Sequence, residues 1–147
     1  MDRAACTEAI VAAKASAGLT FAGIADKVGR HEVWTTAAIF GQAQMDLGEA
    51  QALAELLELG PEVTAALQQH PMRGSLDDVV PVDPLLYRFH EITQVYGTTM
   101  KALIHEKFGE GIMSAIDFEL EIDRVEDPKG DRVRVVYNGK FLPYRKW

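Results

Sequence analysis

The sequence predicts an α+β fold, in which an all-α N-terminal bundle precedes a small domain built from helix and antiparallel β-structure. Three observations support this prediction. Across the first 70 residues, apolar side chains recur at helical spacing between glycines. A second helical stretch begins at Asp83-Pro84, where Asp can cap the helix and Pro suits its first turn. From Ser114 onward, apolar and acidic residues alternate with the period of two that is typical of a half-buried strand.

The N-terminal helical domain is expected over residues 1–75. Thr20 can cap a helix, because its hydroxyl can accept a hydrogen bond from a free backbone N–H group. Asp46 and Glu49 have the spacing of a capping box. Pro61 starts a further helix, since proline fits the first helical position. The predicted helices run approximately over residues 4–17, 21–28, 31–40, 46–59 and 61–70.

The predicted helices over residues 21–28 and 31–40 are joined by a glycine turn at Gly29. This arrangement resembles the helix-turn-helix of phage-repressor-type DNA-binding domains. A helix that reads DNA needs Arg, Lys, Asn or Gln side chains that reach phosphates and base edges. The second helix offers Arg30 and His31 and then continues with Glu32 and mostly apolar residues. A net charge of −7 and a sequence pI of about 5.0 also argue against binding to polyanions. We therefore expect packing or assembly, and no nucleic-acid binding, for this repressor-like bundle.

The C-terminal domain is expected over residues 76–147, with a connector that contains Gly and Pro at residues 71–82. The predicted elements are helices over residues 83–96 and 98–108 and strands over residues 114–123, 132–137 and 140–144, with turns at residues 127–130 and 138–139. A domain of about 70 residues buries little core and leaves open strand edges, so it is marginal alone. We therefore predict an obligate homo-oligomer in which this dimerisation domain supplies the interface.

Motifs for metal, nucleotide or membrane binding do not occur in the sequence. Cys6 is the only cysteine, which excludes an intrachain disulfide and a cysteine metal cage. The four histidines show no ligand spacing, and neither HExxH nor GxxxxGK[ST] is present. No stretch approaches about 18 uninterrupted apolar residues, the length that a membrane-spanning helix needs. We expect a cytoplasmic protein without a metal or an organic cofactor.

Three polar residues are the candidates for chemistry. Arg88 and Glu91 are three residues apart and so share one face of the predicted helix. Ser114 follows the glycine loop FGEGIM and enters the first strand, where its hydroxyl and nearby backbone N–H groups can face a small ligand. Spacing alone leaves a second interpretation open. In it, Arg88 and Glu91 form a solvated ion pair worth at most about 0.5 kcal/mol, and Ser114 has no role beyond its place in the strand.

The run YRFHEITQVYGTTMKALIHEKFGEGIMSAIDFEL, followed by DPKG and NGKFLPY, resembles the C-terminal domain of the cyanase (cyanate hydratase, cyanate lyase) family. The front half, with LTFAGIADKVG, WTTAAIFGQAQM and EAQALAELLEL in this order, resembles the N-terminal helical domain of that family. The resemblance implies that the catalytic residues are Arg88 of YRF, Glu91 three positions later and Ser114 of GIMSAI. Two departures stand close by: Glu110 replaces a common aspartate, and His90 occupies a position that is often aromatic.

The resemblance also implies an activity. Members of the family convert cyanate and bicarbonate, the co-substrate, into carbamate and carbon dioxide, and the carbamate then gives ammonia and a second carbon dioxide. They use no metal or organic cofactor. Arg88 is then expected to bind and orient an anion, and Glu91 to orient Arg88 or to transfer a proton. Ser114 and the backbone N–H of Ala115 are expected to donate hydrogen bonds to the same anion.

The family forms a ring-like decamer built from dimers, with sites shared between subunits, and its N-terminal domain does not bind DNA. Two other classes of protein stay open. A helix-turn-helix transcriptional regulator with a C-terminal dimerisation domain needs a basic reading face, which we do not find in the sequence. A catalytically silent assembly protein keeps the fold but does not need Arg88, Glu91 and Ser114 together.

Overall fold

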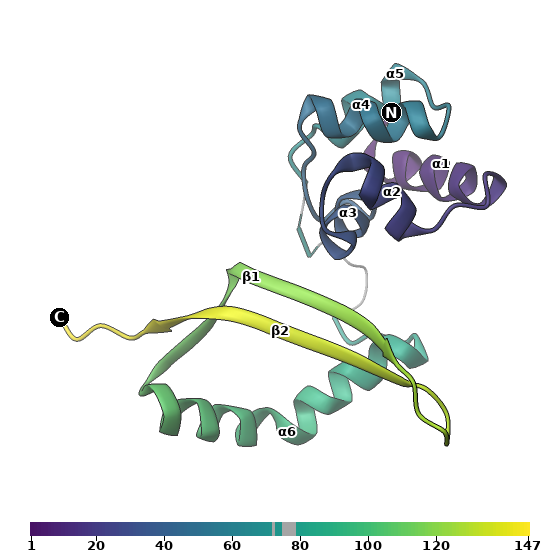
Figure 1. The fold of residues 1–147 in the computed structure, drawn as a ribbon. Helices are drawn as coiled ribbons and strands as arrows, with labels where there is room; N and C mark the ends of the chain where they lie inside the picture. Colours follow the sequence, from purple (N-terminus) through teal and green to yellow (C-terminus); the bar gives the residue numbers. More distant parts are fainter. Residues whose placement is uncertain (72, 75–78) are drawn as a thin grey trace. The chain divides into compact units, whose positions relative to one another are not determined.

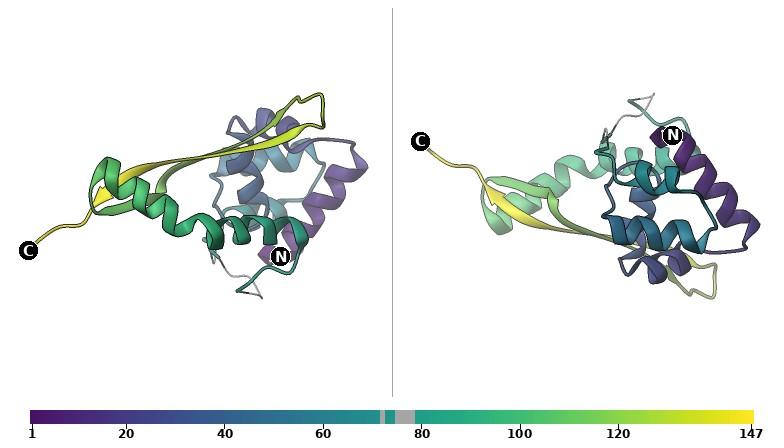
Figure 2. Two further views of the ribbon diagram at one scale, coloured as in Figure 1. Left: turned by 90° about the horizontal axis from the view of Figure 1, so that it is seen from below. Right: turned by 90° about the horizontal axis from the view of Figure 1, so that it is seen from above.

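A computed structural model describes residues 1–71, 73–74 and 79–147 of the chain. The chain forms two compact units, Met1–Ser75 and Leu76–Trp147 (Figure 1). Within the described ranges, five short helices make up the first unit, and one long helix with a β-hairpin makes up the second (Figure 2). Part of the connector predicted at residues 71–82, namely residue 72 and residues 75–78, lies outside the described residues. The helices and the antiparallel strand pair confirm the predicted α+β class.

The helices of the first unit begin where local sequence signals place them. Thr20 caps α2, because its Oγ1 accepts a hydrogen bond from the Gly23 N–H at 3.0 Å. Asp46 and Glu49 form the predicted capping box at the start of α4, and Pro61 occupies the first turn of α5. These predictions are confirmed. The bounds are α1 Arg3–Ser16, α2 Phe21–Val28, α3 Glu32–Ile39, α4 Leu47–Leu56 and α5 Pro61–Leu67.

The first unit has its own hydrophobic core, to which all five helices contribute. Fully buried side chains in it include Cys6, Ile10, Ile24, Ile39, Leu53, Val63 and Leu67. Arg3 joins α1 to two other helices, because its guanidinium donates hydrogen bonds to the carbonyls of Ala38 in α3 and Ala66 in α5. Each carbonyl also accepts a backbone N–H, from Gly41 and from Gln69, so Arg3 adds a second hydrogen bond at two helix ends. Burial within this core raises the pKa of the Cys6 thiol.

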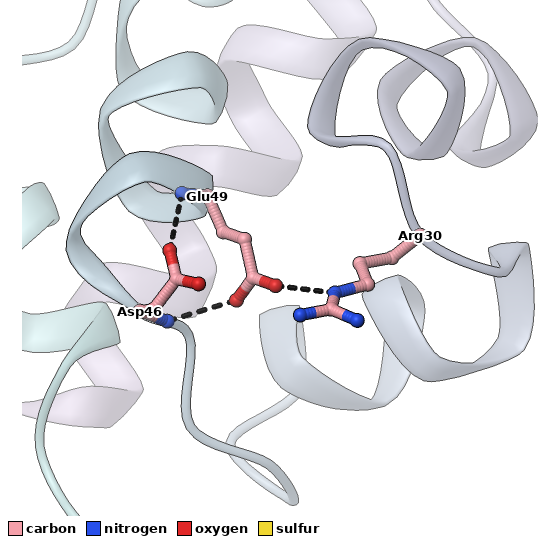
Figure 3. A network of polar contacts seen from close by, with 3 residues as sticks. All are labelled: Arg30, Asp46 and Glu49. Atoms are coloured by element: carbon pink, nitrogen blue, oxygen red, sulfur yellow. Dashed lines mark hydrogen bonds and ion pairs between the residues drawn. The ribbon is translucent and has the colours of Figure 1, made fainter.

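The turn between α2 and α3 is held by an ion pair with α4 (Figure 3). Arg30 donates from Nε to one carboxylate oxygen of the buried Glu49, and the other oxygen of Glu49 accepts the Asp46 N–H at 2.8 Å. The hydrogen bond to Glu49 raises the pKa of Arg30. His31 caps α3, with its Nδ1 accepting the Val33 N–H at 3.3 Å. Both polar residues that the sequence offers to DNA at this turn therefore have structural partners.

Helix α6, Pro84–Phe108, opens the second unit and is continuous for 25 residues. Asp83 caps it, as predicted. The sequence also predicts that this helix stops at Gly97 and that Thr98 caps another, and this prediction is wrong. A single glycine costs a helix only about 1 kcal/mol relative to alanine, and here it does not adopt the positive φ of a helix end. The helix therefore continues through Gly97.

Two long antiparallel strands complete the second unit, β1 Gly111–Val125 and β2 Arg132–Pro143. The predicted turn over residues 127–130 is confirmed, with the Gly130 N–H donating to the Asp127 carbonyl at 2.9 Å. The predicted turn at residues 138–139 and the third strand after it are wrong, because β2 continues through these positions. Strand β1 is long enough to pair with all of β2, so the chain does not fold back again.

The two strands pair in two segments that are separated by a bulge in β1. Residues 111–113 lie opposite residues 141–143, and residues 118–125 lie opposite residues 132–139. Residues 114–117 lie between these segments, where β2 supplies only Lys140. Bulges of this kind bend the strand that carries the extra residues. Figure 1 shows this bend as a sharp change in the direction of β1.

The second unit buries very little by itself. Among residues 79–147, only Gly111 and Ser114 are buried, and α6 has no buried residue. Large apolar side chains are instead exposed along α6: Leu85, Leu86, Phe89, Ile92, Val95, Tyr96, Met100, Leu103 and Phe108. An exposed apolar surface of this length is typical of an interaction surface.

Candidate functional site

Helix α6 carries Arg88 and Glu91 in its first turns. Nη1 of Arg88 lies 3.2 Å from Oε2 of Glu91, so the predicted shared helix face is confirmed. The guanidinium also lies near the Tyr87 ring, 5.3 Å from its centroid. The two side chains of the ion pair are 60% and 46% exposed, which means that a small anion can approach the guanidinium from solvent. At this exposure the pair contributes at most about 0.5 kcal/mol to folding.

Ser114 lies within the β1 bulge, a few residues inside the strand rather than at its entry. Its Oγ accepts two backbone hydrogen bonds, from the Ile116 N–H at 3.1 Å and from the Asp117 N–H at 2.9 Å. A serine hydroxyl has two acceptor positions and one proton to donate. Because both acceptor positions are filled, the hydroxyl can offer a ligand only its proton. Ala115, the next residue of the bulge, is exposed.

Polar contacts join only two of the three predicted site residues in the part of the chain that the structure describes. In the described part of the chain, no hydrogen bond or ion pair joins Ser114 to Arg88 or Glu91. The second unit does contain a hollow of about 470 Å³, between the C-terminal half of α6 and the start of β1. Its lining includes Gly97, Lys101, His105, Glu110, Ile112 and Tyr144, and none of the three predicted residues. Among the described residues, an ion pair joins Arg88 to Glu91, whereas the hydrogen bonds of the Ser114 hydroxyl stay within the bulge.

The two departures from the family pattern, His90 and Glu110, have different neighbours. The ring of His90 packs against Tyr87, with centroids 5.9 Å apart, next to the Arg88–Glu91 pair. Glu110 lines the hollow, and its carbonyl accepts the Tyr144 N–H at 3.1 Å. Sequence reasoning did not find His105, whose Nε2 lies 3.2 Å from the Gly111 carbonyl and links the end of α6 to β1. No spacing rule signals such a contact, because it crosses a helix end.

Neither a metal cluster nor a membrane-spanning helix is found in the described residues. No group of three or more His, Cys, Asp and Glu side chains there is placed to hold a metal ion. No single helix in these ranges is long and apolar enough to cross a membrane. The pair α1 and α2, bent by 108°, meets the requirement by combined length and composition alone.

The fold and these residues define a class of α+β protein: a five-helix unit precedes a long helix with an exposed arginine–glutamate pair and a hairpin with a buried serine. Two family models match such a chain from end to end. The model "Cyanate hydratase, N-terminal" matches residues 3–71, and the model "Cyanate lyase C-terminal domain" matches residues 78–146. The chain therefore belongs to the cyanate hydratase (cyanate lyase) family, which confirms the resemblance seen in the sequence.

Individual relatives agree with the family models. A cyanate hydratase of Synechococcus sp. (strain CC9311) is 57% identical over 141 residues, which cover 96% of this chain and 94% of the relative. A cyanate hydratase of Cupriavidus necator is 52% identical over the whole of both chains. The crystal structure of a cyanase from T. urticae superposes with a TM-score of 0.81 at 38% identity, covering 94% of this chain and 96% of that one.

Proposed function

We propose that this chain, a lyase of the cyanate hydratase family, decomposes cyanate with bicarbonate as its second substrate. The observation that carries the proposal is the 52% identity to a cyanate hydratase over the whole of both chains. The residues expected to act, Arg88, Glu91 and Ser114, are all present in their motifs. Cyanate, bicarbonate and one proton give carbamate and carbon dioxide. The carbamate then takes up a second proton and gives ammonia and carbon dioxide.

The charge of the two substrates sets the main physical requirement of this reaction. Two anions held about 4 Å apart repel each other by roughly 4 kcal/mol at an effective dielectric constant of 20. The protein has a net charge of −7, so its overall field cannot attract them. Local cations and N–H or O–H donors must therefore supply the attraction. The exposed guanidinium of Arg88 and the free proton of the Ser114 hydroxyl are groups of this kind.

Each site residue has a role that its geometry supports. Arg88 binds and orients one anion and stabilises negative charge on the adduct, with its guanidinium fork suited to paired oxygens. Ser114 donates its hydroxyl proton to an anion oxygen, and the Ala115 N–H assists it. Glu91, 3.2 Å from Arg88, orients the guanidinium or transfers the proton that the nitrogen takes up as carbamate forms. Holding a bicarbonate oxygen next to the cyanate carbon contributes the proximity effect.

The site is completed between chains of a homo-oligomer, in this proposal a decamer built from dimers. Two features support this arrangement. Helix α6 presents a long exposed apolar surface, and in the described residues no hydrogen bond joins Ser114 to Arg88. A second copy that packs on α6 would cover the apolar side chains and could bring a further Arg88 to the same site. Two guanidinium groups would then face two anions.

We propose no metal or organic cofactor for this reaction, since proton transfer, orientation and electrostatic stabilisation are sufficient for it. The transcriptional regulator is the weaker alternative. Arg30 and His31, the polar residues at the start of the second helix of the pair, are engaged with Glu49 and with the end of α3. The cytoplasmic location stays a prediction.

The decisive experiment is ammonia release from cyanate by the purified oligomer, with and without added bicarbonate in buffer depleted of carbon dioxide. Rapid release that depends on bicarbonate is the expected result. Release that is independent of bicarbonate would remove the two-anion mechanism and leave a simple hydrolase. No release in either buffer, from an assembled oligomer, would identify a fold without this chemistry.

A further inference from the structure

Gly139 stands in a position that its sequence context does not explain. The pair Asn138-Gly139 is the strongest short signal for a hairpin turn, yet both residues lie inside β2. Gly139 does not have a positive φ, so backbone conformation gives no reason for glycine. In the interior of a strand, glycine lowers stability and often marks a place where another backbone comes close. We therefore look for the reason in the space around residue 139, which must be too small for a side chain.

The space around Gly139 is taken by the residues that precede and begin the bulge. A Cβ atom on residue 139 would lie 2.4 Å from the carbonyl oxygen of Ser114. It would also lie 2.6 Å from Cγ of Met113. The Met113 side chain can move aside at little cost, but the Ser114 oxygen belongs to the backbone. An added methyl group must therefore displace either the backbone of Ser114 or the strand that carries Gly139.

The backbone of Ser114 also sets where its hydroxyl points. Oγ is tied to the N–H groups of Ile116 and Asp117, so the bulge and the side chain form one unit. Movement of the Ser114 carbonyl therefore moves the bulge and the Ser114 side chain together. The free hydroxyl proton then points elsewhere. An error of about 1 Å in such a group can cost a hundredfold in rate.

We propose that Gly139 is a positioning residue for Ser114. Its lack of a side chain lets β2 lie against the Ser114 carbonyl and holds the bulge in the form that directs the hydroxyl proton to an anion. The inference rests on the proposed function for its effect on rate. Its effect on the bulge is inferred from the hairpin geometry alone. The effect on rate and the effect on the bulge can therefore be tested separately.

The first test is a double-mutant cycle between Gly139→Ala and Ser114→Ala in the assembled protein. We expect Gly139→Ala to lower kcat/KM by about a hundredfold, as the misplacement of a reacting group predicts. In the Ser114→Ala background the same change should cost less than about threefold, since the group that it misplaces is gone. Equal losses in both backgrounds would overturn the proposal, because Gly139 would then act independently of Ser114.

A matched control separates this effect from general damage to the hairpin. Gly130 lies in the turn of the same hairpin at φ +118°, with open space around it, so Gly130→Ala strains the hairpin without touching Ser114. This variant should keep kcat/KM within about threefold of the parent protein. A loss equal to that of Gly139→Ala would overturn the proposal. Failure of Gly139→Ala to assemble would also overturn it and assign Gly139 to folding instead.

The second test reads the geometry without any activity. Hydrogen exchange measured on peptides that span residues 112–118 reports the N–H groups of Ile116 and Asp117. Both Gly139→Ala and Ser114→Ala should speed their exchange, while Gly130→Ala should not. If the parent protein releases no ammonia from cyanate, the proposed function fails and this comparison still decides the role of Gly139. Unchanged exchange in Gly139→Ala would overturn the inference even in an active enzyme.

Discussion

The two units of this chain differ in where their apolar side chains find partners. In the first unit, all five helices bury apolar residues against one another, and the turn at Arg30 is tied to α4 by the buried Glu49. In the second unit, residues 79–147 bury only Gly111 and Ser114, while α6 exposes a row of apolar side chains. Burial of apolar surface is the main force in folding. The first unit therefore buries its own core within one chain, whereas the exposed apolar surface of the second unit is what the proposed oligomer would cover.

Polar contacts in the second unit do not replace the missing core. The hairpin carries cross-strand ion pairs, such as Arg134 with Asp123 at 2.7 Å, whose side chains are about half exposed. Pairs in this environment contribute about 0–1 kcal/mol each. The same exposure leaves Arg88 and Glu91 accessible to substrate. The region that is least able to hold itself together is thus the one that carries the predicted site.

The largest effect should come from Arg88→Leu, which tests whether exposure in the second unit serves chemistry. Loss of the guanidinium leaves two anions without their local cation, so kcat/KM should fall by about 10³-fold. Size-exclusion chromatography and ammonia release together check this. Arg88→Lys keeps the charge without the fork and should lose less. If Arg88→Leu abolishes assembly, the residue is structural and the role proposed for it is wrong.

Assembly should respond next, through the apolar surface of α6. Ile92→Asp places a charge on a side chain that is 48% exposed in the single chain and buried in the proposed oligomer. We expect smaller particles in analytical ultracentrifugation and an ammonia release that falls with them, while the first unit stays folded. Gln94→Asp on the same helix is the control and should remain assembled. An intact oligomer in Ile92→Asp would mean that this part of α6 faces solvent.

A pair of leucine substitutions sharpens the contrast between the two units. Leu53→Ala empties a fully buried position of the first unit and should cost about 3 kcal/mol at any protein concentration. Leu103→Ala alters a side chain that is 49% exposed in one chain, so its cost should depend on assembly. Thermal unfolding measured over a range of concentrations checks both, because association makes the midpoint depend on concentration. Identical behaviour of the two variants would contradict the comparison.

The smallest effect should come from an unpaired hydroxyl group in the core of the first unit. Thr35 is fully buried, and within the described residues its Oγ1 has no hydrogen-bond partner. Thr35→Val keeps the shape and removes the unpaired hydroxyl, so stability should rise by about 1 kcal/mol. Thr36→Val, on the neighbouring half-buried position, should change little. A lower melting midpoint for Thr35→Val would show that the hydroxyl has a partner in the protein.

Prediction from sequence succeeded where neighbouring residues decide the structure and failed where distant ones do. The caps at Thr20, Asp46 and Asp83 were found, because each cap satisfies backbone groups within three residues. The breaks at Gly97 and at Asn138-Gly139 were misplaced. Glycine is permissive rather than directive, so it signals a turn only when the rest of the fold requires one. At Asn138-Gly139, β1 is long enough for β2 to continue without a turn.

For the site, sequence reasoning could identify the residues but not their environment. The spacing of Arg88 and Glu91 fixes their shared helix face, and the structure agrees. The bulge around Ser114, which fills both acceptor positions of the hydroxyl, has no local signature. It depends on the register between the two strands, which pairs Met113 with Phe141 and Phe118 with Gly139, and register is a property of the pair.

Local chemistry and motifs of specific sequence were enough to predict the α+β class, the helix caps, the turn at residues 127–130 and membership of the cyanate hydratase family. Only the tertiary structure decided that α6 is one helix, that β2 runs through Gly139, and that Ser114 can only donate. No residue of α6 is buried in one chain, so its continuity through Gly97 reflects the permissive conformation of glycine. The course of β2 and the bulge around Ser114 instead arise from the pairing of β1 with β2, which joins residues far apart in the chain. Local propensity cannot specify that.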